Sequence, residues 1–126
     1  MSDNPELNNI FIEYANYHLP KEFYWSQVQI NFNYDIQKHK DGLNQNESII
    51  VAFGDYTGGE LCIDVDGDIE EVDIQDRVYK FNGSLYTHWV KDFDGDRWSL
   101  VFFTHHSEEK LRELEIKKLT NNINEL

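Results

Sequence analysis

Four residues of this chain could together perform metal chemistry: His39, Asp41, His88 and Arg97, which follow one another in that order. Two imidazoles and one carboxylate form a facial triad, the ligand set that holds non-haem Fe(II) on one side and leaves its other coordination positions open. The guanidinium of Arg97 could anchor the far carboxylate of a keto acid bound at such a metal. The order and spacing of the four residues predict an Fe(II) site with a keto-acid anchor.

Each of these residues has a simpler explanation when it is taken alone. The tripeptide His39-Lys40-Asp41 could lie in a surface loop, and His88 could be a hydrogen-bonded structural histidine among apolar neighbours. Arg97 could form an ion pair on the surface of a strand. The metal-site interpretation therefore depends on the complete set. An extended backbone would help it, because alternate residues of such a segment present His39 and Asp41 on the same side.

The elements that must position these residues are predicted to be mainly β strands, with one helix at each end. The N-terminal helix begins with Asn4 as its N-cap and Pro5 at its first position, and it ends before Pro20. A C-terminal helix is predicted from Ser107 to about Leu119. The strands between them are separated by glycine-marked turns and are expected over 25–34, 48–53, 60–65, 72–73, 77–81, 85–90 and 97–104. Many short, evenly spaced strands favour a sandwich or a barrel.

The last predicted strand shows how a sheet could hold the anchor. Arg97 and Ser99 share one face of this strand, because successive side chains alternate between faces. The other face carries Trp98, Leu100 and Phe102; it is wholly apolar and is expected to lie under a helix. An inward-facing arginine beside a serine needs an anionic partner.

The chain resembles a known family around these residues. The segments that carry the resemblance are His39-Lys40-Asp41, Asn44 and Ser48, the Gly-Asp-Tyr-Thr-Gly-Gly-Glu-Leu block of 54–61, Phe81-Asn82-Gly83, Thr87-His88-Trp89-Val90 and the segment 95–100 with its Arg-Trp-Ser element. Together they resemble the core of the Fe(II)/2-oxoglutarate dioxygenases. The block of 54–61 is similar to small members related to the TET/J-binding-protein and prolyl-hydroxylase-like branches. The resemblance implies a double-stranded β-helix, a cupin-type jelly roll, with a core over about 24–104 in a single domain of residues 1–126.

The resemblance also implies a role for each site residue. His39, Asp41 and His88 would bind Fe(II), Arg97 would hold the distal carboxylate of the cosubstrate 2-oxoglutarate, and Ser99 would hydrogen-bond to that carboxylate. With O₂ as the second small-molecule partner, the implied activity is hydroxylation of a substrate with formation of succinate and CO₂. The substrate is left open between a modified nucleobase and a peptidyl side chain.

Three further residues, Asn31, Asn33 and Tyr34, are candidates for the pocket, and a solvated polar strand face explains them equally well. Two other functions are also weighed. One is a non-catalytic cupin-like ligand-binding module, which the complete four-residue set argues against. The other is zinc in the same triad with hydrolytic chemistry, which would have no use for the keto-acid anchor at Arg97.

Composition limits the partners and the compartment. The net charge of −13 over 126 residues disfavours nucleic acid as a general partner, although a local basic patch stays possible. The single cysteine, Cys62, excludes an intrachain disulfide and fits a reducing compartment. No apolar run approaches the length of a membrane span and no signal peptide is recognised. We therefore expect a cytoplasmic or nuclear protein that is not secreted and has no membrane partner, with its oligomeric state open.

Several acidic or histidine-containing segments are expected to have structural roles only. The segments 64–68 and 92–96 resemble fragments of calcium loops but lack the glutamate at the twelfth position and the flanking helices of an EF-hand. Their Asp-Gly pairs are predicted to form hairpin turns. Gly58-Gly59 is not followed by the residues of a phosphate-binding loop. His105-His106 is expected in a loop at the end of a strand.

Overall fold

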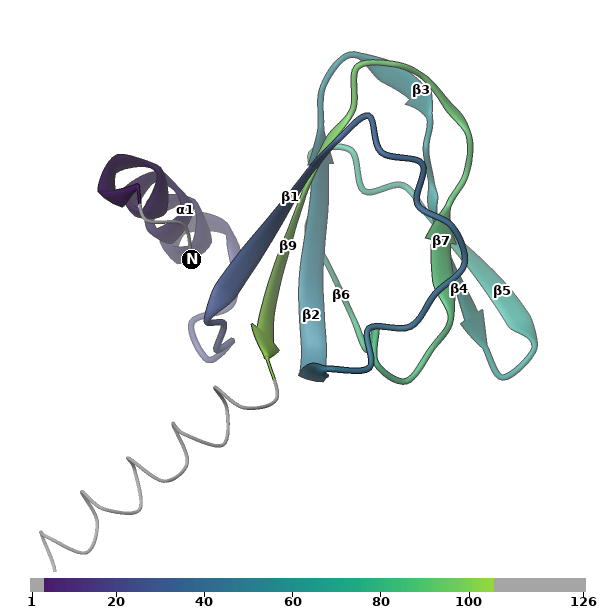
Figure 1. Cartoon of the computed structure of the whole chain (residues 1–126), viewed down its shortest axis with the longest axis horizontal. Coiled ribbons are helices and arrows are strands. Elements are labelled where there is room, and N and C mark those ends of the chain that lie inside the picture. Colours follow the sequence, from purple (N-terminus) through teal and green to yellow (C-terminus); the bar gives the residue numbers. More distant parts are fainter. Residues whose placement is uncertain (1–3, 106–126) are drawn as a thin grey trace, which may run out of the picture.

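The computed structural model of the chain describes residues 4–105, which form one helix and nine strands (Figure 1). The elements are α1 (Pro5–His18), β1 (Gln27–Phe32), β2 (Asn44–Phe53), β3 (Tyr56–Gly58), β4 (Leu61–Val65), β5 (Asp68–Val72), β6 (Tyr79–Phe81), β7 (His88–Val90), β8 (Phe93–Gly95) and β9 (Trp98–His105). The prediction of a mainly β fold with an N-terminal helix is confirmed. The predicted C-terminal helix and His106 lie outside the described residues.

All strand pairs between named strands are antiparallel, and they form three sheets. The largest has the strand order β1-β9-β2-β6, a second has the order β5-β4-β7, and β3 pairs with β8. The inward face of the four-stranded sheet packs on the three-stranded sheet. Their shared core contains Ile50 and Ala52 from β2, Leu61 and Ile63 from β4, and Val90 from β7. Two facing antiparallel sheets match the sandwich class predicted from the strand spacing.

Helix α1 covers the opposite face of the four-stranded sheet (Figure 1). Its start is as predicted, because the side chain of Asn4 accepts a hydrogen bond from the backbone N–H of Leu7 at 3.1 Å and Pro5 is the first helical residue. Phe11 and Ala15 of the helix pack with Phe102 of β9 in a second core. The Phe102 end of the apolar face of β9 therefore lies under a helix, as the sequence predicts, whereas Trp98 at its other end is exposed. No helix within residues 4–105 is long and apolar enough to cross a membrane.

The two Asp-Gly segments have different structures. Asp66 and Gly67 form the turn between β4 and β5 with φ angles of 54° and 95°, as a hairpin turn of this kind requires. The prediction of a second hairpin turn over 92–96 is wrong. Phe93–Gly95 is strand β8 and pairs with the distant β3. The Asp-Gly pair marks a backbone position that favours positive φ, but it does not distinguish a turn from a strand end.

Several predicted strands have different bounds in the structure, and two of them have a clear local cause. The short strand expected over 72–73 is the end of β5. The acidic residues in the first part of β5 interrupt the alternation of apolar and polar residues by which a strand is predicted. The strand expected over 85–90 is shortened to β7, because the side chain of Asn82 accepts a hydrogen bond from the Leu85 N–H at 3.1 Å and holds a turn there. This turn leads directly into His88.

Candidate metal centre

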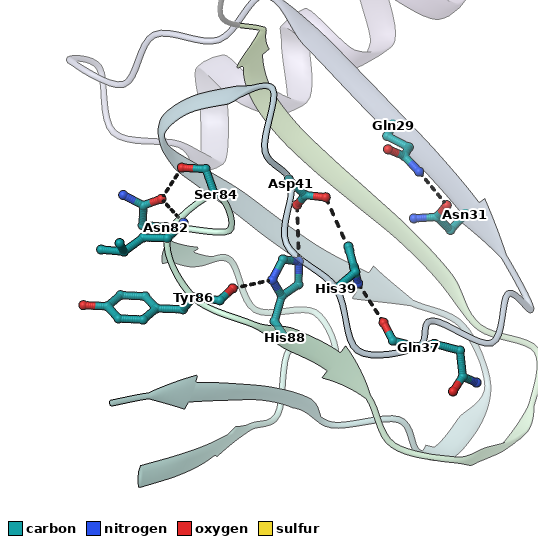
Figure 2. Close-up of polar contacts among 10 residues, drawn as sticks. Gln29, Asn31, Gln37, His39, Asp41, Asn82, Ser84, Tyr86 and His88 are labelled. Carbon is teal, nitrogen blue, oxygen red and sulfur yellow. Dashed lines mark hydrogen bonds and ion pairs between the residues drawn. The ribbon is translucent and has the colours of Figure 1, made fainter. Parts of the chain in front are cut away.

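Three of the predicted metal ligands meet in the structure, although they come from different segments. One ligand atom from each of His39, Asp41 and His88 lies within 4.8 Å of the other two. The Asp41 carboxylate stands between the two rings, with Oδ1 3.3 Å from Nε2 of His39 and Oδ2 3.2 Å from Nε2 of His88 (Figure 2). In the described part of the chain, this is the one group of histidine, cysteine and acidic residues with such spacing.

Backbone hydrogen bonds bring these segments together. His39 and His88 form an isolated antiparallel bridge, in which each backbone N–H donates to the carbonyl of the other residue, at 3.0 and 2.9 Å. The N–H of Asp41 donates to the carbonyl of Gly83 at 2.8 Å. The segment between β1 and β2 is thus fixed against β7 and the turn that precedes it.

Both imidazoles are oriented by the same local contact. Nδ1 of His39 lies 2.7 Å from the carbonyl oxygen of Gln37, and Nδ1 of His88 lies 3.0 Å from that of Tyr86 (Figure 2). Because a carbonyl only accepts, Nδ1 must carry the proton, and Nε2 of the neutral ring is left with a lone pair. Both lone pairs then face the oxygens of Asp41. Such a set of electron-pair donors is suited to a divalent cation.

Gly83 is a part of the site to which sequence reasoning gave no role. A Cβ atom at this position would lie 2.9 Å from Oδ2 of Asp41 and 3.1 Å from Cε1 of His88. The second distance matters more, because the His88 ring is held by its backbone bridge and its contact with Tyr86. Gly83 therefore leaves the room that the carboxylate and the ring occupy. The signal in the sequence was the segment Phe81-Asn82-Gly83, which belongs to the resemblance but gave Gly83 no role.

The triad opens on one side to a cavity of about 360 Å³. The exposed fraction of the side chain is 6% for His88 but 40% for His39 and 30% for Asp41, so the open side lies toward the latter two. Amide and aromatic side chains contribute to the lining, including Gln29, Asn31, Tyr34, Gln37 and Asn44. The structure thus places two of the three predicted pocket residues, Asn31 and Tyr34, on the cavity that contains the triad. Asn33 does not line it, because its side chain accepts a hydrogen bond from the Arg97 backbone N–H at 2.7 Å and donates one to Asp96 at 3.0 Å.

The predicted anchor lies in a different environment. Arg97 is only 3% exposed, and its Nε and Nη2 atoms have no hydrogen-bond partner. Its guanidinium carbon lies 5.5 Å from the ring of Tyr56 and 5.7 Å from that of Phe93. Burial lowers the pKa of Arg97, whereas charge attraction to Tyr56 and a hydrogen bond with it act in the opposite direction. Among residues 4–105 no carboxylate forms an ion pair with this buried cation.

Arg97 and Ser99 do not line the cavity in this structure. Ser99 lies further along the inward face of β9, the face from which Val101 reaches the cavity wall, and Arg97 directly precedes this strand. A line of hydrogen bonds joins the two places: the Gln29 amide donates to Oδ1 of Asn31 at 3.2 Å, and the Asn31 amide donates to Oγ of Ser99 at 3.3 Å. Gln29 was not anticipated from the sequence, although its place two residues before Asn31 in a strand was a usable signal.

Comparison with known proteins supports a shared fold. No protein-family model matches the chain, and no curated protein matches it. A solved structure of NgTET1 in complex with 5mC DNA is similar, with a TM-score of 0.59 and 24% sequence identity. The match covers 91% of this chain and 56% of that chain. This chain therefore spans little more than half the length of NgTET1, and at this identity the likeness shows the fold alone.

Proposed function

We propose that this chain is an Fe(II)- and 2-oxoglutarate-dependent dioxygenase, built on a double-stranded β-helix, that hydroxylates its substrate with formation of succinate and CO₂. The observation that carries the proposal is the triad of His39, Asp41 and His88, whose donor atoms converge within 4.8 Å. The fold shared with NgTET1 and the sequence resemblance to the dioxygenases support the same conclusion.

The residues of the triad fit a divalent metal by chemistry as well as by distance. Two imidazole nitrogens and one carboxylate oxygen are the donor set of non-haem Fe(II) sites. The carbonyls of Gln37 and Tyr86 act as the outer contacts that orient metal-binding histidines. When bound, Fe(II) would supply the activation of O₂ on which oxidative decarboxylation and hydroxylation depend. His39, Asp41 and His88 would hold the metal from one side and leave its other side toward the cavity.

Arg97 and Ser99 would bind the distal carboxylate of 2-oxoglutarate. A buried guanidinium with two unpartnered nitrogens is costly to leave without an anion. A carboxylate can accept parallel hydrogen bonds from such a group, which fixes its direction as well as its charge. The Ser99 hydroxyl already accepts from Asn31, and its own proton stays available to the same carboxylate. We assign these two residues to the cosubstrate and the Asn31 amide to the orientation of Ser99.

The substrate would be a small group presented by a larger molecule. A cavity of about 360 Å³ has room for the cosubstrate and only one further small group, such as a single base or side chain. The 5mC DNA bound to NgTET1 favours a modified nucleobase. The net charge of −13 opposes a long nucleic-acid contact, so a peptidyl side chain is kept as the alternative.

Succinate formation tests the proposed function directly. The protein is reconstituted with Fe(II) without oxygen, supplied with 2-oxoglutarate and O₂, and assayed against single-stranded DNA, RNA and peptides. Asp41→Asn is the matched control, because it keeps the shape of the ligand and removes its charge. We expect succinate from the wild type well above that control. Wild-type protein that binds 2-oxoglutarate but never exceeds the control would instead identify a ligand-binding module.

A further inference from the structure

Strand β1 is an edge strand with an unusual composition. It is the outermost strand of the β1-β9-β2-β6 sheet. The segment 23–34, which contains it, has no Asp, Glu, Lys or Arg, whereas 28% of all residues in the chain are charged. Edge strands are normally protected from pairing with other chains by lysine, proline or a bulge. Strand β1 has none of these, and its register with β9 runs without a shift.

The register shows which backbone groups this edge presents. The N–H of Asn33 donates to the carbonyl of Arg97 at 2.9 Å, and from there β1 and β9 pair residue by residue. In an antiparallel ladder, the residues that bond to one neighbour alternate with residues that point the other way. The N–H and C=O groups of Val28, Ile30 and Phe32 therefore face away from β9. No strand of the described residues pairs with that side of β1.

The same part of the sheet has an uncovered apolar surface. Ile30, Phe32 and Trp98 are 41%, 48% and 46% exposed, on the face of the sheet that helix α1 covers further along. The rings of Phe32 and Trp98 stack with their centroids 4.3 Å apart. Each of these three residues thus keeps more than two fifths of its surface exposed. Edge hydrogen-bonding groups and an apolar row thus coincide on β1.

We propose that β1 is a self-association surface on which two copies of this chain pair their β1 strands antiparallel. The twofold axis passes at Ile30, so that Ile30 faces its own copy and Val28 faces Phe32 of the partner subunit. Such a contact is isologous, and one apolar row satisfies both sides. The free N–H and C=O groups of Val28, Ile30 and Phe32 then bond to the same groups of the second copy.

The pattern of β1 favours a second copy over an unrelated partner, because apolar and amide residues alternate symmetrically about Ile30, so an antiparallel copy places apolar opposite apolar and amide opposite amide. Two chains of net charge −13 repel each other over most of their surfaces, and β1 offers an uncharged approach. The pairing involves one short strand from each copy, so the interface is of the small, transient class below about 1,200 Å². The association should therefore depend on concentration and become stronger with salt, which screens the repulsion.

The pairing has a consequence for the cavity. The side chains of Gln29 and Asn31 point to the inward side of β1 and line the cavity beside the triad. In the register proposed here, Gln29 stands opposite Asn31 of the partner subunit. The second copy would thus border the mouth of the cavity. The pairing itself does not depend on the metal or on the proposed reaction, so the two proposals can fail separately.

Sedimentation and crosslinking of the full chain test this surface, with Ile69 as the matched control. Ile69 is also an exposed isoleucine on an edge strand, β5, but its neighbours are acidic. We expect the wild type to dimerise with rising concentration, Ile30→Lys to stay monomeric, and Ile69→Lys to dimerise as the wild type does. Oxidation should link Ile30→Cys, but not Ile69→Cys, into a covalent dimer.

Ile30→Pro gives a second test that the fold should tolerate. The Ile30 N–H faces away from β9, and proline is accepted at such positions of edge strands. We expect this variant to keep the wild-type melting temperature within a few degrees and to lose dimerisation. A wild type that stays monomeric up to about 1 mM, the limit of weak specific association, would overturn the proposal. A dimer that survives Ile30→Lys and Ile30→Pro in folded protein would overturn it as well.

Discussion

The triad and the Arg97 site lie in the same β sandwich, but their polar groups differ in exposure and in hydrogen-bond partners. At the triad, His39 and Asp41 are partly exposed and His88 is buried, and the carboxylate oxygens lie 3.2–3.3 Å from a nitrogen of each ring. At Arg97 the guanidinium is closed off by Tyr56 and Phe93, and two of its nitrogens have no partner. The polar groups of the triad thus have one another as close partners, whereas two nitrogens of the Arg97 guanidinium have none.

This difference implies that a metal at the triad and an anion at Arg97 would bind with different free energies. A metal must displace protons and water from an open triad, and its binding follows the availability of neutral histidines. An anion at Arg97 meets a cation that is already desolvated, where a charge-assisted hydrogen bond is stronger than in water. We expect changes at the triad to remove the chemistry, and changes at Arg97 to affect cosubstrate affinity and stability in opposite directions.

Replacing Asp41 should have the largest effect. Asp41→Ala removes the only carboxylate of the triad, and Asp41→Asn removes only its charge, so both should abolish succinate formation, a loss of more than about 100-fold. His88→Ala should do the same. In the wild type, Mn(II) at about 100 times its dissociation constant should raise the free energy of unfolding by about 2.7 kcal/mol. Thermal melting should show that increase in the wild type and not in Asp41→Ala.

The matched control for Asp41 is Asp66, in the β4–β5 turn. Asp66→Ala also removes one exposed carboxylate, but it should leave metal-dependent stabilisation and turnover nearly intact. Equal losses in Asp41→Ala and Asp66→Ala would show that general charge, and not the triad, explains metal binding.

Arg97 should have the next largest effect. Arg97→Met keeps an apolar stem against Tyr56 and Phe93 and removes the guanidinium. The affinity for 2-oxoglutarate should fall about 30- to 1,000-fold, equivalent to about 2–4 kcal/mol, because a charge-assisted pair of hydrogen bonds is lost. Metal binding should survive. Calorimetric titration with 2-oxoglutarate in the presence of Mn(II) measures both.

Arg97→Met also distinguishes the two sites when its stability is measured without ligands. Removing buried donors that have no partner should raise the free energy of unfolding by about 1–3 kcal/mol. Denaturant unfolding of Arg97→Met against the wild type measures this difference. A folded variant with unchanged 2-oxoglutarate affinity would exclude Arg97 from the cosubstrate site.

Gly83 leaves room for the side chains of Asp41 and His88, and its replacement should reduce metal affinity to an intermediate degree. A methyl group at this position would press on the Asp41 carboxylate and the His88 ring. Gly83→Ala should therefore weaken metal affinity about 10- to 100-fold, the range found for groups that orient metal ligands. Gly42→Ala is the control, since a Cβ there meets nothing within 4 Å. The same affinity for Mn(II) in both variants would remove Gly83 from this role.

Much of this arrangement could be predicted from the sequence, and the rest depends on contacts between distant segments. Alternation and the Asn4-Pro5 signal are local, so most strands and the start of α1 were anticipated. Strand β8 was not, because Phe93–Gly95 becomes a strand only by pairing with β3. Residue types and order suggested the triad, whereas the contact between Gly83 and Asp41 exists only once two loops meet.

Replacing residues of the hydrogen-bonded series from Gln29 through Asn31 to Ser99 should have the smallest effect. These variants also test most closely whether the triad and the Arg97 site act separately. Asn31→Ala removes one neutral hydrogen bond to Ser99, which contributes about 0.5–1.5 kcal/mol, so the KM for 2-oxoglutarate should rise about 2- to 10-fold while kcat changes little. Gln29→Ala acts one step further away and should change that KM less. Asn31→Ser, which keeps a donor near Ser99, should recover part of the affinity. If Asn31→Ala changed metal affinity and left the KM for 2-oxoglutarate unaltered, Asn31 would belong to the triad's cavity and not to the Arg97 site.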